Sequence, residues 1–153
     1  MATELTRRVT ASCAIAVVSL GLAATASAAP GAAAHQRVST VKISLGRVLS
    51  NPSGRVLYLF EKDGKNVSHC GHVCSEYWPK LMSTGTPVAG AHVSASHLGR
   101  TKAGQVTYYG HPLYSYVGDT KPKQDNGQGS TAFGAKWYVV GTNGHKIDPS
   151  GGA

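Results

Sequence analysis

The feature of this sequence that most restricts its possible folds is an internal repeat. Residues 54–63 align without gaps on residues 110–119, with Gly, Leu, Tyr and Asp at the same offsets and an aromatic residue, Phe60 or Tyr116, at a fifth. A Leu-Gly-Arg triplet lies upstream of each segment, and a Trp lies downstream of each. Two copies of one motif within 153 residues predict two homologous halves of one small domain.

The local pattern in both copies is typical of β-structure. Short runs rich in β-branched and aromatic residues alternate with clusters of Gly, Pro and Asn. Turns are expected at residues 51–54 and 109–112, and Asn143-Gly144 is a strong hairpin signal. The apolar runs that these turns join, which we expect to form strands, are 41–49, 56–60, 106–109, 113–117, 137–140 and 145–147.

We therefore predict a mostly all-β domain over residues 40–148. It is built from two pseudo-repeated β-hairpin units, the first at about 41–82 and the second at about 95–148. The Ala-, Gly- and Pro-rich leader at 29–39 and the tail at 149–153 are expected to be disordered.

Short helical turns are expected to complete the domain. The best candidate lies within residues 74–81, where Pro79 would end the helix. Two weaker helix candidates are residues 45–49 and 91–98.

The first 28 residues have the composition of a secretory signal peptide. Arg7 and Arg8 form a short basic region, residues 9–26 are apolar or small, and Ala26-Ser27-Ala28 supplies the small-x-small pattern that signal peptidase needs. A membrane anchor is disfavoured because this run is Ala-rich and lacks the roughly 20 strongly apolar residues of a stable span. No other part of the sequence is a candidate span, so the mature chain is expected to lack one.

The route of export stays open between the general secretory and the twin-arginine pathways, since Thr6-Arg7-Arg8 is an incomplete twin-arginine signal. Cys13 stands at the start of the apolar run, whereas a lipid-modified Cys would follow it. We therefore expect Cys13 to be removed with the signal peptide.

After that removal only Cys70 and Cys74 remain, and the compartment is oxidising. A disulfide between them is expected, closing a short loop and stabilising a local turn. The alternative is that this segment binds a metal or acts in redox chemistry. His69 and His72 lie beside the two cysteines, and thiolates with imidazoles suit copper or zinc.

The repeated motif supplies the candidate site residues, which are Tyr58, Phe60, Asp63, Tyr114, Tyr116 and Asp119. Within a strand, the two aromatic residues of each copy lie on one face. The favoured interpretation is structural: the aromatic rings pack in the core, and each Asp accepts N–H groups from the turn that follows it. In the alternative, the Tyr hydroxyls and Asp carboxylates converge on a ligand.

Both copies fit the pattern Tyr-x-(Phe/Trp/Tyr)-x-x-Asp, which resembles a bacterial family of secreted repeat proteins and predicted lipoproteins with a Tyr-x4-Asp motif. Further similarities are Cys74 before Trp78-Pro79, the stretch 125–129, and the run 137–140 before a Gly. The resemblance covers about residues 40 to 147. It implies the architecture and an extracytoplasmic location, but no activity. This chain lacks a usable lipobox, so a freely secreted or wall-held form is expected.

The charge of the chain bears on its partners. Fifteen Lys and Arg against seven Asp and Glu give a formal net charge of +8. An exported protein of this charge is attracted to anionic cell-wall polymers or to a membrane surface. The basic residues are spread along the chain without a tight cluster and interleaved aromatics, so nucleic acid is not expected as a partner.

Catalysis finds little support in the sequence. There is no Gly-x-Ser-x-Gly nucleophile elbow, and the only paired carboxylates are those of the repeat. We therefore expect an exported, non-enzymatic envelope or extracellular protein, binding or structural, without a cofactor. The alternative is an extracytoplasmic metal-binding or redox accessory protein that uses residues 69–74.

The signal-peptide interpretation leads to a prediction about processing. N-terminal sequencing of the exported protein should begin at Ala29, or within a few residues of it, because cleavage follows Ala26-Ser27-Ala28. Exported protein that still carries residues 1–28 would contradict the interpretation.

Overall fold

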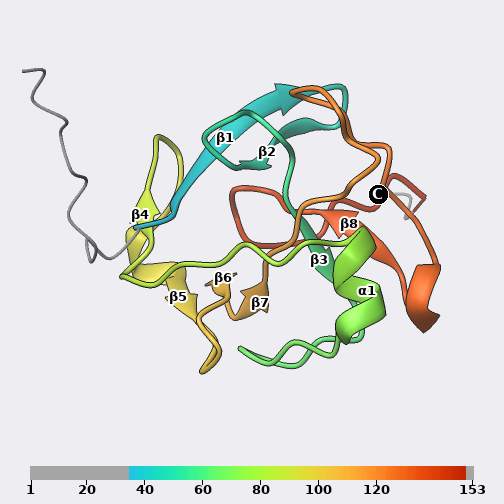
Figure 1. Ribbon diagram of the computed structural model, residues 1–153. Coiled ribbons are helices and arrows are strands. Elements are labelled where there is room, and N and C mark those ends of the chain that lie inside the picture. The colour runs from blue at the N-terminus through green and yellow to red at the C-terminus, as the bar shows by residue number, and fades with distance from the viewer. Residues whose placement is uncertain (1–34, 151–153) are drawn as a thin grey trace, which may run out of the picture. The chain divides into compact units, whose positions relative to one another are not determined.

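Three small sheets organise residues 35–150, which are the part of the chain that the computed structural model describes (Figure 1). The predicted signal peptide, the first part of the predicted leader and residues 151–153 lie outside it. Within the described residues strands greatly outnumber helices, so the prediction of a mostly all-β domain is confirmed.

A β-hairpin begins the described chain. β1 (Arg37–Ile43) pairs antiparallel with β2 (Gly46–Ser50), and it also pairs in parallel with the short strand β4 (Val88–Ala89). The weak helix candidate at 45–49 is therefore wrong: pairing with β1 holds this run extended and buries its Val and Leu side chains. β1 also begins inside the predicted leader, because Val38 belongs to the core and is fully buried.

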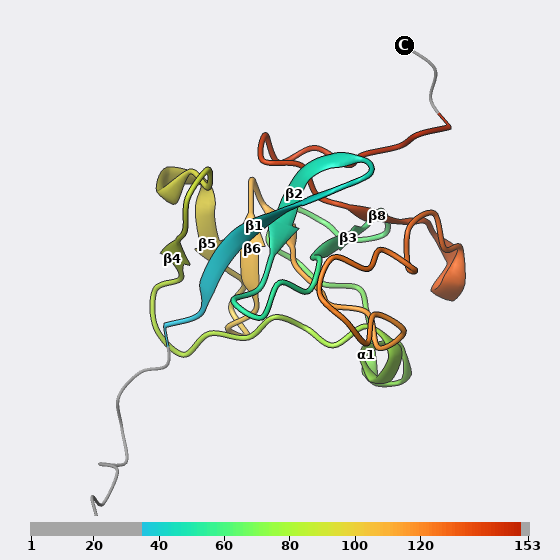
Figure 2. The ribbon, with the colours of Figure 1, turned by 90° about the horizontal axis from the view of Figure 1, so that it is seen from above.

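The central pairing joins the two copies of the motif. β3 (Tyr58–Phe60), from the first copy, pairs antiparallel with β8 (Trp137–Val139), from the second. Seen from above, the β1–β2 hairpin lies across β3 and β6 (Figure 2). Backbone bonds attach it to the residues that flank β8 and β3, since Leu49 N–H donates to the Val140 carbonyl and Leu57 N–H donates to the Leu49 carbonyl.

Both faces of the β3–β8 ribbon are covered, and this divides the core into two clusters. Alternate side chains point to opposite faces of a strand, so neighbouring residues of the ribbon belong to different clusters. This explains why both runs are almost continuously apolar. One cluster contains Val48, Val56, Tyr58, Phe60, Cys70, Cys74, Trp78, Tyr114, Trp137 and Val139. The other contains Val38, Leu49, Leu57, Leu59, Val106, Tyr108, Leu113, Tyr138 and Val140.

The third sheet contains the turn predicted at 109–112. β5 (Leu98–Arg100), β6 (Val106–Tyr108) and β7 (His111–Pro112) pair antiparallel in that order. Tyr109 and Gly110 connect β6 to β7, both with positive φ (49° and 85°), which matches the twist of a tight hairpin.

Not every predicted strand forms. The run 113–117 is not a regular strand, because Tyr114 makes only isolated bridges, to Tyr58 and to Lys80, and the run 145–147 makes only the bridge from Lys146 to Val140. The run 41–49 is divided between β1 and β2 by a turn at residues 44 and 45. The turn at Asn143-Gly144 is present, with the Gly144 N–H bonded to the Gly141 carbonyl.

The helices are short. α1 (His72–Tyr77) starts two residues before the predicted segment and ends before Pro79, as expected for a residue that lacks an N–H. The 3₁₀ turn η1 (Ala95–His97) lies within the weak candidate 91–98, whereas a second turn, η2 (Ala132–Gly134), is not predicted from the sequence. No helix within residues 35–150 is long and apolar enough to span a membrane.

Candidate functional site

The two copies of the motif meet at Tyr58 and Tyr114, around a local pseudo-two-fold axis. The Tyr58 N–H donates to the Tyr114 carbonyl (2.9 Å), and the Tyr114 N–H donates to the Tyr58 carbonyl (3.0 Å). Both side chains are completely buried. Tyr58 and Tyr114 therefore do not line an open cleft, and the two copies are joined at these residues in the core.

The side chains of the motif are exchanged between the copies. The Tyr58 hydroxyl donates to Asp119 Oδ2, and the Tyr114 hydroxyl donates to Asp63 Oδ2, each at 2.6 Å. Each tyrosine thus binds the aspartate of the other copy. We call these two interactions the crossed pairs.

Each aspartate also holds the segment that follows it. Asp63 Oδ1 accepts the N–H of His69 (2.7 Å), and Asp119 Oδ1 accepts the N–H of Asn126 (2.9 Å). The Gly127 N–H donates to the Tyr58 hydroxyl oxygen (3.3 Å). The carboxylates therefore do what the structural interpretation expects of them, and they bind the tyrosines as well.

The second aromatic residue of each motif and the Trp downstream of it continue this symmetry as a stack of four rings. The order is Phe60, Trp137, Trp78 and Tyr116, with ring centroids 4.1, 3.9 and 4.4 Å apart. Tyr58 contacts Trp78 edge-on at 5.3 Å, and Tyr114 contacts Trp137 in the same way at 5.1 Å. Phe60 and Trp78 come from the first copy, and Trp137 and Tyr116 come from the second. Successive rings of the stack therefore alternate between the copies and join them.

Close approach to this stack explains one glycine of the stretch 125–129. A Cβ on Gly127 would lie 2.6 Å from the ring of Trp78, which is too close for any side chain. A glycine here lets the backbone reach both the indole and the Tyr58 hydroxyl.

Burial dominates the electrostatics of the crossed pairs. Desolvation, followed by the bond to Asp119, raises the pKa of Tyr58 far above its ordinary value, and desolvation with the bond to Asp63 does the same for Tyr114. Desolvation also raises the pKa of each aspartate, although the bonds from the tyrosines and from backbone N–H groups oppose it. The hydroxyl protons of both tyrosines are thus held firmly in the folded protein.

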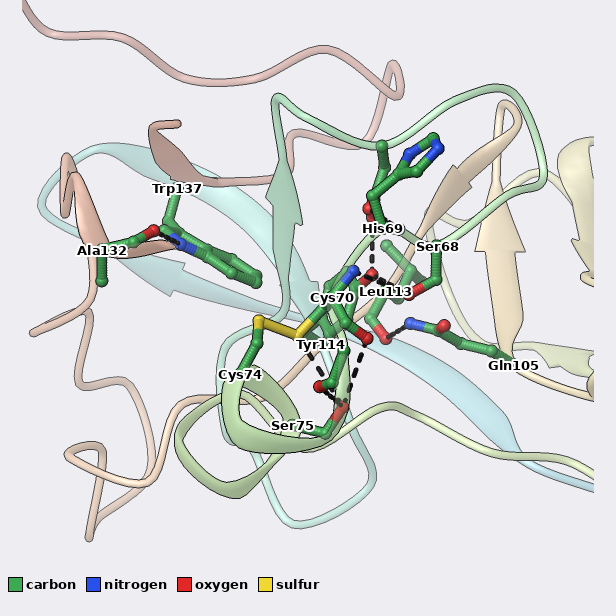
Figure 3. Close-up of a disulfide and its surroundings, with 12 residues drawn as sticks. Ser68, His69, Cys70, Cys74, Ser75, Gln105, Leu113, Tyr114, Ala132 and Trp137 are labelled. Carbon is green, nitrogen blue, oxygen red and sulfur yellow. Dashed lines mark hydrogen bonds between the residues drawn. A yellow bond between two sulfur atoms is a disulfide. The ribbon is translucent and has the colours of Figure 1, made fainter. Parts of the chain in front are cut away.

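The disulfide between Cys70 and Cys74 is present, in the segment that Asp63 holds. So short a loop contributes about 2 kcal/mol in the chain-entropy model. The imidazole of His69 points away from the disulfide (Figure 3), and His72 lies on the exposed face of α1 beside Glu76. The alternative metal or redox role would therefore rest on two exposed imidazoles and a disulfide. Residues 35–150 contain no group of three or more His, Cys, Asp or Glu placed to hold a metal ion.

A cleft of about 570 Å³ opens beside one of the crossed pairs. We call it the basic cleft. Four of its side chains are cationic, and among the described residues no Asp or Glu lines it. It is lined by Lys65, Asn66, Val67, Ser68, Lys80, Met82, Arg100, Thr101, Lys102, Ala103 and Gln105.

The cations of the basic cleft are available to a ligand. Arg100 is held in place by bonds to the carbonyls of Ser83 (3.1 Å) and Thr84 (2.8 Å), neither of which neutralises its charge. Within residues 35–150, none of the three lysines forms an ion pair.

The cleft is connected to the motif through two polar side chains. Ser68 Oγ lies 2.8 Å from the Tyr114 hydroxyl oxygen, and Gln105 Nε2 donates to the Leu113 carbonyl (2.9 Å) (Figure 3). Gln105 is 1% exposed, and its Oε1 has no hydrogen-bond partner among the described residues. The charge of Lys80 acts on the pKa of Asp63, in the direction that favours the carboxylate.

The structure thus brings the six motif residues together, with Tyr58, Phe60, Tyr114 and Asp119 buried and Asp63 and Tyr116 partly buried. The basic cleft is missed from the sequence, since its charged residues are scattered between positions 65 and 102. The one available signal, an excess of basic over acidic residues, predicts a charged partner without locating its site.

Comparison with known proteins agrees with the doubled motif. A family model described as a secreted repeat of unknown function matches twice, at residues 39–82 and at residues 99–141. No curated protein and no solved structure matches the chain.

The crossed pairs predict which residues are energetically coupled. A double-mutant cycle of Tyr58→Phe with Asp119→Asn should give a coupling energy of about 0.5–3 kcal/mol in denaturant unfolding, because these side chains share a bond. Tyr58→Phe with Asp63→Asn, from the same copy, is the matched control and should be closer to additive. A larger coupling within a copy than between copies would contradict the exchange.

The raised tyrosine pKa values predict a loss of stability in alkali. Unfolded tyrosines ionise near pH 10, whereas Tyr58 and Tyr114 resist ionisation in the folded protein. Their contribution is therefore complete below about pH 10 and decreases as the pH rises further. Unfolding free energy measured against pH should fall less steeply in Tyr58→Phe and Tyr114→Phe than in the unmodified protein. Tyr109→Phe, at an exposed position, is the control and should keep the original slope.

Proposed function

The chain belongs to a family of secreted repeats of unknown function, and from that premise we propose that it is a non-enzymatic, extracytoplasmic protein that binds an anionic polymer in the basic cleft. The observation that carries the proposal is the cleft itself, where four cations gather and no carboxylate of residues 35–150 belongs to the lining. A polymer with regularly spaced negative charges, such as a wall polymer rich in phosphate, is complementary to such a surface.

The shape of the cleft supports a ligand rather than solvent alone. Its volume of about 570 Å³ lies within the range of about 300–1,000 Å³ that is usual for ligand sites. The exposed apolar side chains of Val67 and Met82 border the charges and would contact the uncharged parts of a repeating unit.

The groups at the basic cleft support the non-enzymatic part of the proposal. Asp63, on whose pKa the charge of Lys80 acts, already accepts bonds from the Tyr114 hydroxyl and the His69 N–H. The hydroxyl of Thr101 accepts the Gln105 N–H. Among the described lining residues there is no His, Cys, Asp or Glu to act as a general base or a nucleophile.

A binding measurement tests the proposal. The mature protein should bind immobilised poly(glycerol phosphate) at low salt and be released above ~0.15 M salt, where the Debye length falls below about 8 Å. Lys80→Gln combined with Lys102→Gln should weaken binding about tenfold, since each exposed charge pair is worth up to about 1 kcal/mol.

The matched control removes the same charge elsewhere, as Lys42→Gln combined with Lys121→Gln, at two exposed positions outside the cleft. It should retain most of the affinity. Equal losses in the two double variants would show that net charge, not the cleft, is responsible. Absence of binding at low salt would reject the proposal altogether.

A further inference from the structure

A second hollow lies beside α1 and η2. Its lining is mostly aromatic, whereas that of the basic cleft is rich in cations. We call this second hollow the aromatic slot. Its volume is about 180 Å³, below the range of about 300–1,000 Å³ for drug-sized ligands, so it has room for about one ring. It is lined by Tyr77, Trp78, Tyr116, Ser130, Ala132 and Phe133.

The slot exposes aromatic surface at a conformational cost. The side chain of Phe133 is 37% exposed and that of Tyr77 is 52% exposed, with their ring centroids 5.9 Å apart. Phe133 also has φ +67° and ψ +21°, a left-handed conformation that bulky residues rarely adopt. Packing of the core does not require an exposed ring in a strained backbone, and such strain is often found where a ligand is held.

The back of the slot is rigid because it is the end of the ring stack. Trp78 is held between Trp137 and Tyr116, and Trp137 Nε1 donates to the Ala132 carbonyl (2.9 Å). This bond attaches η2, and with it Phe133, to the stack (Figure 3). The slot is thus preorganised by the same aromatic contacts that join the two copies of the motif.

The polar groups of the slot identify the kind of ring that it suits. The hydroxyls of Tyr77 and Tyr116 take part in none of the hydrogen bonds found within residues 35–150. Ser130 Oγ accepts the Ala132 N–H (3.3 Å), so its own proton is free to donate. Among the described residues that line the slot, none carries a charge.

We propose that the aromatic slot binds one neutral pyranose ring of a saccharide. A pyranose has apolar C–H faces, which pack on aromatic rings, and hydroxyls around its edge, which match the unpaired hydroxyls of the slot. An aromatic side chain from a peptide would fill the apolar part but leave these hydroxyls without partners. The site is separate from the basic cleft and does not depend on the proposed function.

Titration of the mature protein tests this proposal, with a neutral glucan tetrasaccharide and a neutral N-acetylglucosamine tetrasaccharide as probes. At least one should shift the NMR signals of the Trp78 indole and the Phe133 ring. Tyr77→Ser and Phe133→Gly should each weaken that binding about tenfold or more. The melting temperature of each variant, measured alongside, separates a loss of binding in the folded protein from a loss of folding, and glycine accepts the positive φ of position 133.

Val117→Ser, at an exposed apolar position outside the slot, is the control and should leave binding unchanged. N-acetyltyrosine amide serves as the competing probe. The proposal is overturned if neither tetrasaccharide binds, if the two slot variants bind as well as the unmodified protein, or if only the tyrosine derivative shifts the slot signals.

Discussion

The crossed pairs are the interaction on which the rest of this structure depends. Tyr58 and Tyr114 are fully buried, and each finds its acceptor only in the other copy. A buried hydroxyl or carboxylate left without its partner costs about 1–3 kcal/mol, so neither copy can satisfy its own motif. The ring stack and the β3–β8 ribbon also need both copies, because each of them is formed by residues of the two halves. The repeat is therefore one cooperative unit and not two linked modules.

Within this near-symmetry, the candidate sites lie where the copies differ. Asp119 is 1% exposed and accepts the N–H of Asn126 and the hydroxyl of Tyr58. Asp63, its counterpart, is only partly buried and is influenced by the charge of Lys80 at the basic cleft. The disulfide and α1 follow the motif of the first copy, whereas η2 follows that of the second. The shared motif supplies the scaffold, and the segments after it supply the distinctive surfaces.

Local signals in the sequence predicted the local structure well. The turns follow from Gly and Asn, the helix end from Pro79, and the disulfide from two cysteines in an oxidising compartment. The run 45–49 was misjudged because five residues hold too little periodicity to separate a helix from a strand, and pairing with β1 decided between them. The crossing of Tyr58 to Asp119 is invisible locally, since a repeat indicates that the copies are alike but not which copy supplies a partner. The left-handed backbone conformation of Phe133 likewise cannot be predicted from the residues next to it in the sequence.

The register of the central ribbon has a consequence for how the protein is made. Phe60 lies opposite Trp137, so the core closes only when nearly the whole chain is available. Contacts between such distant residues form slowly, because the entropy of closing a long loop must be overcome first. A chain of which only the first half is present can form the β1–β2 hairpin but cannot complete either core cluster. Truncation before β8 (Trp137–Val139) would therefore remove the whole native core and not one of two independent halves.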